Sequence, residues 1–133
     1  MLAFLSDEWI AALDEAAQQD PALAELLRDA RLVIEQAVAT AGEVVRYHVA
    51  IGDDGVRVRP GPAEAPTIRF SQDRETAVAI ATGALSAQRA FMTGRLRVGG
   101  DLTVLLAHAD VFAQLDDAFG SVRARTDLAG AGA

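Results

Sequence analysis

Two alternating segments joined by Gly52-Asp53-Asp54-Gly55 constrain the fold of this chain more than any other feature. Before this stretch, valine, tyrosine and isoleucine recur at every second position of residues 44–51, and after it Val56 and Val58 alternate with arginines. Two such segments around a short Gly/Asp turn are typical of a β-hairpin. We therefore expect two antiparallel strands whose side chains divide between one apolar and one polar face.

Three further segments have the pattern of strands. Residues 31–40 alternate in the same way, residues 67–72 place Ile68 and Phe70 on one face, and residues 96–98 are a short fifth strand. The prolines at 60 and 62, around Gly61, end the second strand of the hairpin. Because four of the strands follow one another in sequence, antiparallel pairing is favoured. The sequence predicts one five-stranded, mostly antiparallel sheet.

The segments around these strands have apolar residues at three- and four-residue spacing, which predicts helices. Gly83 and Gly94 are expected to end two of them, and Gly94 to do so in a left-handed conformation. The helices are expected after Ser6, after Asp20, after Ser71 or Asp73, over residues 84–93, and from Leu102 to Phe119 after Asp101, the last one long enough to be kinked.

These elements make a single α/β (α+β) domain over residues 1–133, with the helices on one face of the sheet. Residues 1–30 are expected to supply N-terminal helices, and residues 127–133, which end Gly-Ala-Gly-Ala, a frayed tail.

The composition excludes several classes of function. The net charge is −7, and the chain has twelve arginines, no lysine and no cysteine. Nucleic-acid binding and purely electrostatic attachment to a membrane are therefore not expected. No disulfide or cysteine zinc site can form. The sequence shows no secretory signal and no apolar run long enough for a membrane span, so a cytoplasmic protein is expected.

The sequence also contains no recognisable catalytic or metal-binding motif. His48 and His108 each lack a second ligand at a useful spacing, and Asp53-Asp54 has the pattern of a turn. No nucleophile elbow or phosphate-binding glycine motif is present. We expect no catalytic residue, no metal and no cofactor.

Large apolar side chains gather around the fifth strand and its flanking helices. They fit either an ordinary core or an adaptable apolar cavity, because methionine and phenylalanine beside small alanines suit both. The residues are Phe91, Met92, Leu96, Val98, Leu102, Leu105, Leu106 and Phe112.

The stretch FMTGRLRVGGD, residues 91–101, resembles the signature of the sterol carrier protein 2 (SCP2) family. It has an aromatic–methionine pair, a glycine, a short strand with alternating arginines, and Gly-Asp at the start of a helix. The preceding IATGALSAQRAF is similar to that family's helix–glycine–helix segment, and the resemblance extends over residues 31–125. It implies a sheet covered by helices with an apolar tunnel between them. The absence of lysine departs from basic members of the family.

The resemblance implies non-catalytic binding or transfer of a hydrophobic ligand: a sterol, fatty acid, fatty acyl-CoA or similar lipid. Tyr47, His48, Gln88 and Arg89 are candidate polar anchors, and the helix from Leu102 to Phe119 is the expected lid. The residues expected to line the tunnel are Ile80, Phe91, Met92, Leu96, Val98, Leu102, Leu105, Leu106, Phe112, Tyr47 and Val49.

Two alternatives stay open. An accessory domain could keep the fold with a closed tunnel and bind a protein partner. A small cavity enzyme acting on an apolar substrate would need a cluster of Tyr47, His48 and an acid in a dry pocket. For the carrier, the expected partner is an apolar small molecule, with at most transient membrane contact.

Overall fold

The structure, a computed structural model, describes residues 2–26, 28, 31–52, 55–82 and 84–127. The predicted order of helices and strands is confirmed, and the last helix is divided in two at His108. The elements are β1 (Leu2–Ala3), α1 (Asp7–Gln18), α2 (Pro21–Leu26), β2 (Leu32–Thr40), β3 (Glu43–Gly52), β4 (Gly55–Pro60), β5 (Ile68–Asp73), α3 (Arg74–Ala81), α4 (Ala87–Met92), β6 (Arg97–Gly100), α5 (Leu102–Ala107), α6 (Ala109–Arg123) and β7 (Thr126–Asp127).

The main sheet has five strands in the order β4-β3-β2-β5-β6. The pairs β2–β3, β3–β4 and β5–β6 are antiparallel, as predicted, and β2–β5 is parallel. Gly52 and Gly55 are opposite each other in the hairpin, and the predicted turn residues Asp53 and Asp54 lie outside the described residues. The sheet is therefore mixed, because β5 pairs with β2 and not with the strand before it.

The connection from β4 to β5, residues 61–67, explains the parallel pair. It leaves β4 where the Gly61 N–H donates to the Arg46 carbonyl at 2.8 Å, and it crosses β2 on the face of Glu35, whose carboxylate accepts from the Ala63 N–H at 2.8 Å. At its end the Thr67 N–H donates to the Val33 carbonyl at 2.8 Å. A crossover of this kind brings β5 beside β2 in the same direction.

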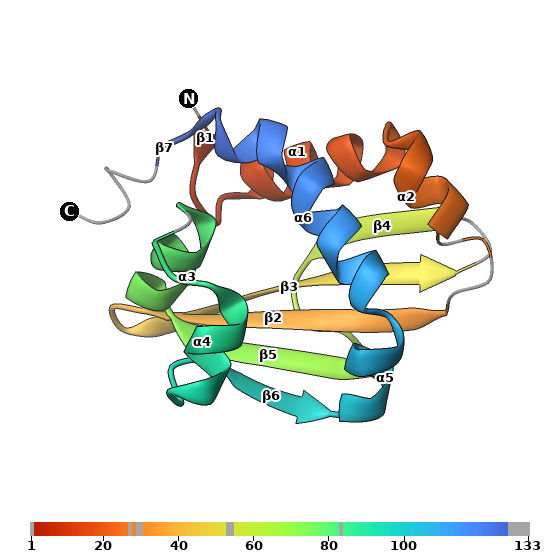
Figure 1. Cartoon of the computed structure of the whole chain (residues 1–133). Helices are drawn as coiled ribbons and strands as arrows, with labels where there is room; N and C mark the ends of the chain where they lie inside the picture. Colours follow the sequence, from red (N-terminus) through yellow and green to blue (C-terminus); the bar gives the residue numbers. More distant parts are fainter. Residues whose placement is uncertain (1, 27, 29–30, 53–54, 83, 128–133) are drawn as a thin grey trace.

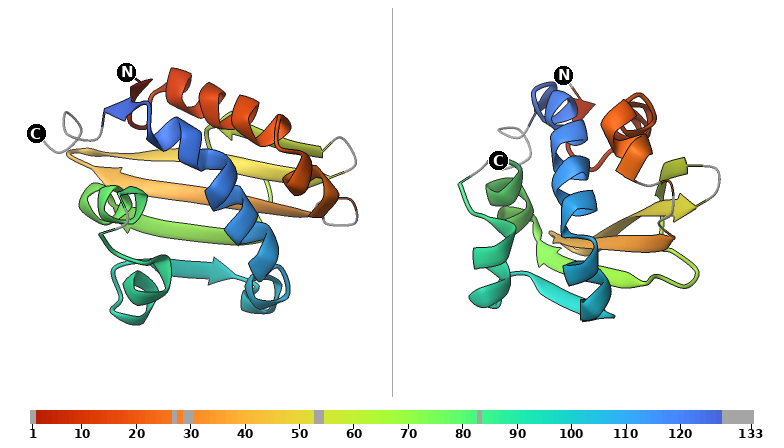
Figure 2. Two further views of the ribbon diagram at one scale, coloured as in Figure 1. Left: turned by 45° about the horizontal axis from the view of Figure 1, so that its top comes forward. Right: turned by 45° about the vertical axis from the view of Figure 1, so that its right-hand side comes forward.

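All the helices lie on the other face of the sheet (Figures 1 and 2). Helix α6 crosses the strands obliquely and α1 runs along the edge strand β4, while α4 and α5 lie at opposite ends of β6 (Figure 1). The Asp14 carboxylate of α1 accepts a hydrogen bond from the Val58 N–H of the edge strand β4 at 2.8 Å. One face is thus covered by helices, as the sequence predicts, and we call the opposite one the open face.

Polar side chains at the predicted caps begin the helices. Ser6 accepts from the Trp9 N–H at 3.2 Å and starts α1. Of the two candidates for α3, Asp73 is the cap, because its carboxylate accepts from the Thr76 N–H at 2.7 Å. These bonds satisfy backbone donors that have no partner within the helix. Gly83, the expected end of α3, lies outside the described residues.

The stretch from Phe91 to Asp101 forms a corner between α4, β6 and α5. Gly94 has a φ of +80°, as expected for a left-handed helix end. Gly100 has a φ of +91°, and a Cβ atom there would lie 2.3 Å from the Thr67 carbonyl oxygen. Asp101 then caps α5 by accepting from the Thr103 N–H at 3.0 Å. Glycine is required at 100 both by its conformation and by this close backbone approach.

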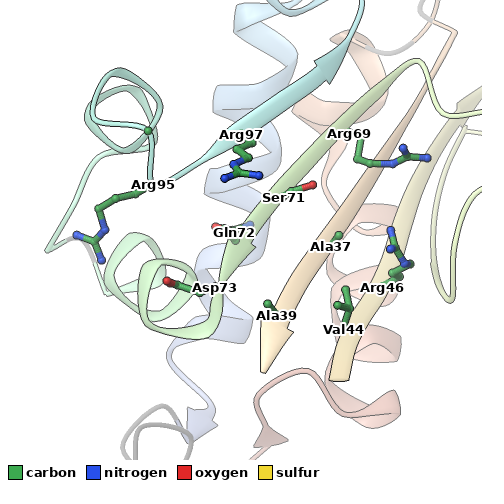
Figure 3. A pocket seen from close by; sticks show the side chains of 11 residues that line it. Ala37, Ala39, Val44, Arg46, Arg69, Ser71, Gln72, Asp73, Arg95 and Arg97 are labelled. Atoms are coloured by element: carbon green, nitrogen blue, oxygen red, sulfur yellow. The ribbon is translucent and has the colours of Figure 1, made fainter. Parts of the chain in front are cut away.

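The open face carries polar and small side chains, since alternate residues of each strand point to it. Figure 3 views this face, with the sheet in front of the helices. Ala37 lies across from Arg46 on β3 and Ser71 on β5, and Ser71 in turn lies across from Arg97. Leu96 is buried while Arg95 and Arg97 are exposed, so the alternation predicted for this strand is confirmed.

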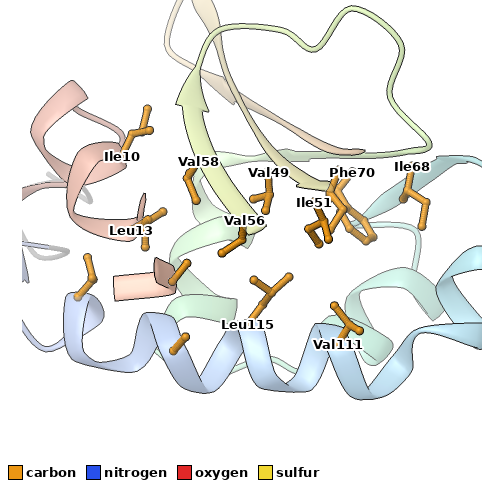
Figure 4. Packing of buried hydrophobic residues seen from close by; sticks show 14 of the residues in the cluster. Ile10, Leu13, Val49, Ile51, Val56, Val58, Ile68, Phe70, Val111 and Leu115 are labelled. Atoms are coloured by element: carbon orange, nitrogen blue, oxygen red, sulfur yellow. The ribbon is translucent and has the colours of Figure 1, made fainter. Parts of the chain in front are cut away.

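The hydrophobic core lies between the sheet and the helices. In Figure 4, side chains of β3, β4 and β5 point toward those of α6, including Val111 and Leu115. Val111 and Val122 of α6 are 1% and 0% exposed. The periodic apolar positions of strands and helices therefore meet in one core, which is how both periodicities bury their apolar sides.

A second, two-stranded parallel sheet was not predicted. In it β1 pairs with β7, with Leu2 opposite Thr126 and Ala3 opposite Asp127. Asp127, which the sequence analysis assigned to a frayed tail, is in this pair, and residues 128–133 lie outside the described residues. Two-residue strands carry no measurable alternation, so periodicity could not find them.

Candidate functional site

A pocket of about 130 Å³ lies between the helices and the covered face of the sheet. Helices α1, α3 and α6 contribute to it together with β2, β3 and β5. Its lining residues are Phe4, Trp9, Leu13, Gln36, Val38, Tyr47, Gln72, Ala77, Ile80, Ala81, Phe119 and Arg123. Most of these side chains are apolar, so the pocket is suited to an apolar group.

An aromatic cluster forms one wall. The rings of Phe4 and Trp9 meet edge to face with centroids 5.0 Å apart, and those of Trp9 and Tyr47 do so at 5.4 Å. The Trp9 indole N–H donates to the Thr126 hydroxyl at 3.1 Å, and that hydroxyl donates to the Val122 carbonyl at 2.6 Å. The paired chain ends therefore hold the tryptophan in place, and the indole nitrogen is satisfied without a ligand.

Polar groups form another part of the lining. The Gln72 amide donates to the Gln36 carbonyl oxygen at 2.9 Å. Burial raises the pKa of the Tyr47 hydroxyl, so tyrosine stays neutral and can donate or accept a hydrogen bond. Arg123 adds a cation to the same lining. These groups could orient the polar end of a bound molecule, and none is a base poised against a nucleophile.

The predicted lining residues occupy three environments. Tyr47 and Ile80 line the 130 Å³ pocket. Val49 and Leu96 are 4% and 6% exposed in the core. Three other predicted residues, Val98, Leu105 and Phe112, are partly buried against that core. The rings of Phe112 and Phe70 meet edge to face, with their centroids 6.0 Å apart.

The other four predicted residues are exposed on the two helices that lie at the ends of β6. Phe91 and Met92 on α4 are 45% and 76% exposed, and Leu102 and Leu106 on α5 are 45% and 79% exposed. Large apolar side chains with this exposure, close to a core edge, are candidates for a ligand or partner contact. None of the four lines the 130 Å³ pocket.

Helix α5 is weakly attached to the rest of the fold. None of its residues is buried, whereas α6 contributes Val111, Leu115 and Val122 to the core. The two helices meet at His108, whose φ and ψ of −117° and 31° are not helical and whose side chain caps neither helix. A short helix with no fully buried residue has a low free energy of local opening.

The candidate polar anchors are separated by the fold. Tyr47 lines the pocket, but His48 points to the open face because neighbouring strand residues alternate. The His48 Nδ1 lies 2.9 Å from the Gly61 carbonyl oxygen. Gln88 and Arg89 are exposed on α4. The fold therefore separates Tyr47 and His48, which a cavity enzyme of the considered kind would have to bring together.

Besides the apolar residues Leu13, Val38, Ala77 and Ala81, six pocket residues were not among the predicted ones. Two carry a signal that could have been used: Gln36 and Gln72 stand at positions of β2 and β5 that otherwise bury apolar side chains. An amide on an apolar strand face must find a partner, which indicates a polar point in the core. The other four, Phe4, Trp9, Phe119 and Arg123, come from the chain ends, whose meeting the sequence did not predict.

The described residues contain no group of three or more histidine, cysteine or acidic residues placed to hold a metal ion. Their helices include none with the length and apolar character that a bilayer crossing requires.

Comparisons with solved structures point to one fold. A protein from Thermus thermophilus, titled possibly a sterol carrier protein, is similar over 90% of this chain and 89% of its own, with 17% identity and a TM-score of 0.75. The crystal structure of a sterol carrier protein 2 is similar over 88% and 97%, with 20% identity and a TM-score of 0.72.

A palmitated SCP2L2 from Aedes aegypti is similar over 84% of this chain and 90% of its own, with 21% identity and a TM-score of 0.58. At these identities the likeness shows the fold. A comparison with curated protein sequences finds no significant match.

A model of the SCP-2 sterol transfer family matches residues 12–113. This match includes the main sheet and the corner at residues 91–101 on which the sequence resemblance rested. Because the match covers more than half of the chain, the chain belongs to the SCP-2 sterol transfer family.

Proposed function

We propose that this protein is a non-catalytic carrier that binds an apolar ligand between the helices and the covered face of its sheet. The ligand would be a sterol, a fatty acid, a fatty acyl-CoA or a similar lipid. The observation that carries the proposal is the apolar pocket with a glutamine pair and a neutral tyrosine in its lining. The family supports lipid binding in general, and the palmitated relative suggests a fatty acyl chain as a first candidate.

The pocket is too small for a lipid as it stands, so it must enlarge when the ligand binds. Its 130 Å³ is well below the roughly 300–1,000 Å³ of typical ligand pockets. Burial of about 300 Å² of apolar ligand surface contributes roughly 7 kcal/mol, and association costs at least about 4 kcal/mol. The net binding energy is small, so an opening with a low free energy is part of the proposal.

Helix α5 is the proposed opening element. From the sequence we expected the whole segment from Leu102 to Phe119 to act as a lid. Since α6 is anchored in the core by Val111 and Leu115, we restrict the lid to α5, with His108 as the hinge. Outward movement of α5 would expose the partly buried Leu105 and Phe112. Leu102 and Leu106, which are already exposed, would then contact the ligand or a membrane transiently.

The direct test is uptake of a fluorescent fatty acid, cis-parinaric acid, by delipidated protein, with native mass spectrometry to count bound molecules. We expect saturable uptake of one molecule per chain. Ile80→Trp, which fills the pocket, should reduce uptake at least tenfold. Val44→Trp is the matched control, because Val44 is 50% exposed on the open face, away from the pocket. Folded protein that never takes up the probe would disprove the proposal.

A second variant does not depend on tolerance of a large residue in the core. Leu106 is 79% exposed, so Leu106→Glu should leave the fold intact. If α5 contacts the ligand or the donor membrane during loading, this variant slows transfer of cis-parinaric acid between vesicles by at least threefold. An unchanged rate would exclude α5 as the opening element without excluding lipid binding itself.

One observation favours a second function, an accessory domain with a closed tunnel. The pocket described above is too small for a lipid, and exposed Phe91, Met92, Leu102 and Leu106 could bind a protein partner. If the chain is such an accessory domain, it should remain folded and show no lipid uptake, either by cis-parinaric acid fluorescence or by native mass spectrometry. The cavity-enzyme alternative has less support, because Tyr47 and His48 point to opposite faces of the sheet.

A further inference from the structure

The open face of the sheet is positively charged in a protein of net charge −7. Half of the twelve arginines lie on or beside it: Arg46, Arg57, Arg59, Arg69, Arg95 and Arg97. The carboxylates that accompany them among the described strand residues are Glu35 and Asp73. Asp73 caps α3 and also lines the groove described below, and six arginines against these two carboxylates leave the strand residues of this face with an excess of positive charge.

A groove of about 660 Å³ lies in this face (Figure 3). Its floor includes Ala37 and Ala39 of β2, and the Ser71 side chain lies beside them. Arg46 and Arg69 stand on one side, while Arg95 and Arg97 come from the segment leading into β6 on the other. Small residues between long cationic ones leave room for a ligand that several guanidinium groups can reach together.

The arginines on the two sides of the groove differ in how far nearby carboxylates neutralise them. The Glu35 carboxylate, only 1% exposed, pairs with Arg69 at 2.6 Å and with Arg46 at 3.3 Å. Burial alone would raise the pKa of Glu35, but the Ala63 N–H and the two guanidinium groups hold it below its usual value. One carboxylate thus faces two arginines, whose side chains remain 49% and 41% exposed.

Arg95 and Arg97 have less compensation. Arg95 donates to the Thr76 hydroxyl at 3.3 Å and lies near enough to Asp73 to lower the pKa of that carboxyl, after the larger effect of the Thr76 hydrogen bonds. Arg97 is exposed and forms no ion pair with any described residue. The planar guanidinium fork matches phosphate oxygens, and unpaired donors of this kind favour an anion in the groove.

The size and lining of the groove indicate which anion. Its volume lies within the range of small-molecule sites. Among the described residues, no aromatic side chain lines it to stack a base, and Val44 is the largest apolar side chain in its lining. A long polyanion would also meet the acidic remainder of the protein, whereas a compact one responds to charges within a screening length of about 8 Å. These properties favour a small, multiply charged ligand over nucleic acid or a bilayer.

We propose that this groove is a binding site for a compact phosphate-bearing anion in solution, such as a diphosphate group. Arg97 and Arg46 would hold it from the two sides, with Ser71 between them. The site lies on the face of the sheet opposite the apolar pocket, so it does not depend on the proposed lipid carriage.

The test uses pyrophosphate as the probe, added to the full chain at low ionic strength and followed by calorimetry and by amide shifts in NMR spectra. We expect one saturable site with a Kd below about 1 mM, and the largest shifts around residues 71 and 97. Arg97→Gln and Arg46→Gln should each weaken binding at least tenfold. Arg28→Gln, which removes an exposed arginine of the α2 region that pairs with Glu25, should change it less than twofold.

A variant that keeps every charge separates the groove from general electrostatic attraction. Ala39 is exposed on the groove floor, so Ala39→Leu should fill the space without unfolding the sheet. It should abolish pyrophosphate binding and leave cis-parinaric acid uptake unchanged.

Three results would overturn the proposal. One is the absence of saturation up to 10 times the expected Kd of about 1 mM. Another is an equal loss of affinity in Arg28→Gln and Arg97→Gln, because binding would then follow net charge alone. The third is Arg97-dependent binding to phosphatidylglycerol vesicles without pyrophosphate binding, which would assign this face to a membrane.

Discussion

The two faces of the main sheet are built from the same strands but have opposite chemistry. On β4, Val56 and Val58 are buried at 5% and 2% exposure against the helices, while Arg57 and Arg59 between and after them are exposed. Burial of the apolar side contributes the larger part of the stability, since each buried aliphatic side chain contributes about 1.5–3 kcal/mol. The exposed arginines of β4 contribute little to folding and are free to serve recognition.

The comparison also shows where flexibility can be introduced. Helices α1 and α6 are fixed by buried residues such as Ile10 and Val111, both at most 2% exposed. Helix α5 covers the same side of the sheet but buries none of its residues. The covered face therefore has a rigid part and an easily opened part, and the open face has its charged groove on a rigid sheet. Ligand exchange is expected on the first face and rapid, reversible ion binding on the second.

The largest expected effect comes from breaking the covered face. Ile68 of β5 is fully buried, so Ile68→Ala removes buried methyl groups and leaves a cavity. We expect the free energy of unfolding to fall by about 4 kcal/mol. Val44→Ala, on the open face, is the control and should lower it by less than about 0.5 kcal/mol. Urea unfolding followed by circular dichroism measures both, and similar losses would contradict the assignment of the two faces.

The second largest effect is expected from the backbone conformation at the corner between α4, β6 and α5. Gly100→Ala places a Cβ atom against the Thr67 carbonyl oxygen at a φ of +91°, so we expect a loss of about 3 kcal/mol. Gly94 has a φ of +80° with open space around it, and Gly94→Ala should lose only about 1 kcal/mol. Denaturant unfolding of the two variants gives the difference. If both lose the same amount, the close approach at residue 100 is not a constraint on the fold.

The third prediction concerns the buried carboxylate of the open face. Glu35→Gln removes the partner of Arg46 and Arg69, and we expect a loss of about 2 kcal/mol at pH 7. The folded-state pKa of Glu35 lies below its ordinary value of 4.5. The carboxylate therefore stabilises the fold above about pH 4.5, and this contribution is lost as the pH falls through the folded-state pKa.

Unfolding at pH 7, 5 and 3 by urea measures this dependence. The wild type should lose stability toward pH 3 more steeply than Glu35→Gln does, so the two curves approach each other in acid. Glu64→Gln, which removes an exposed acid from the neighbouring connection, is the matched control and should follow the wild type. A difference between wild type and Glu35→Gln that stays constant with pH would show that the ionised carboxylate is not the cause.

The sequence predicted the parts of this comparison that depend on periodicity. Alternation assigned Ile34, Ile68 and Val58 to a buried face and Arg57 and Arg97 to a polar one, and all five lie as expected. The resemblance in residues 91–101 led to the right family because glycines at 94 and 100 are required by local backbone geometry, which any chain with this corner must satisfy.

What the sequence missed depends on contacts between distant residues. The parallel β2–β5 pair follows from the path of residues 61–67, and the pocket wall depends on Trp9 meeting Thr126. A kink in the last helix was expected, but its place at His108 was not, because the apolar spacing continues without a break from Leu105 to Phe112. Alternation predicted a polar side for Arg57, Arg59 and Arg97, but the gathering of arginines around one groove needed the strand order.

The smallest effect is expected for an arginine of the open face. Arg57 lies across from Ala50 on the edge strand β4 and is exposed, so Arg57→Gln should change the free energy of unfolding by less than about 0.5 kcal/mol. Val58→Ala, one position further on the same strand, should lower it by about 2 kcal/mol. Urea unfolding at low and at high salt measures both variants. A loss above about 1 kcal/mol for Arg57→Gln that disappears at high salt would show that this arginine stabilises the acidic fold through its charge, so the open face would then contribute to folding as well as to recognition.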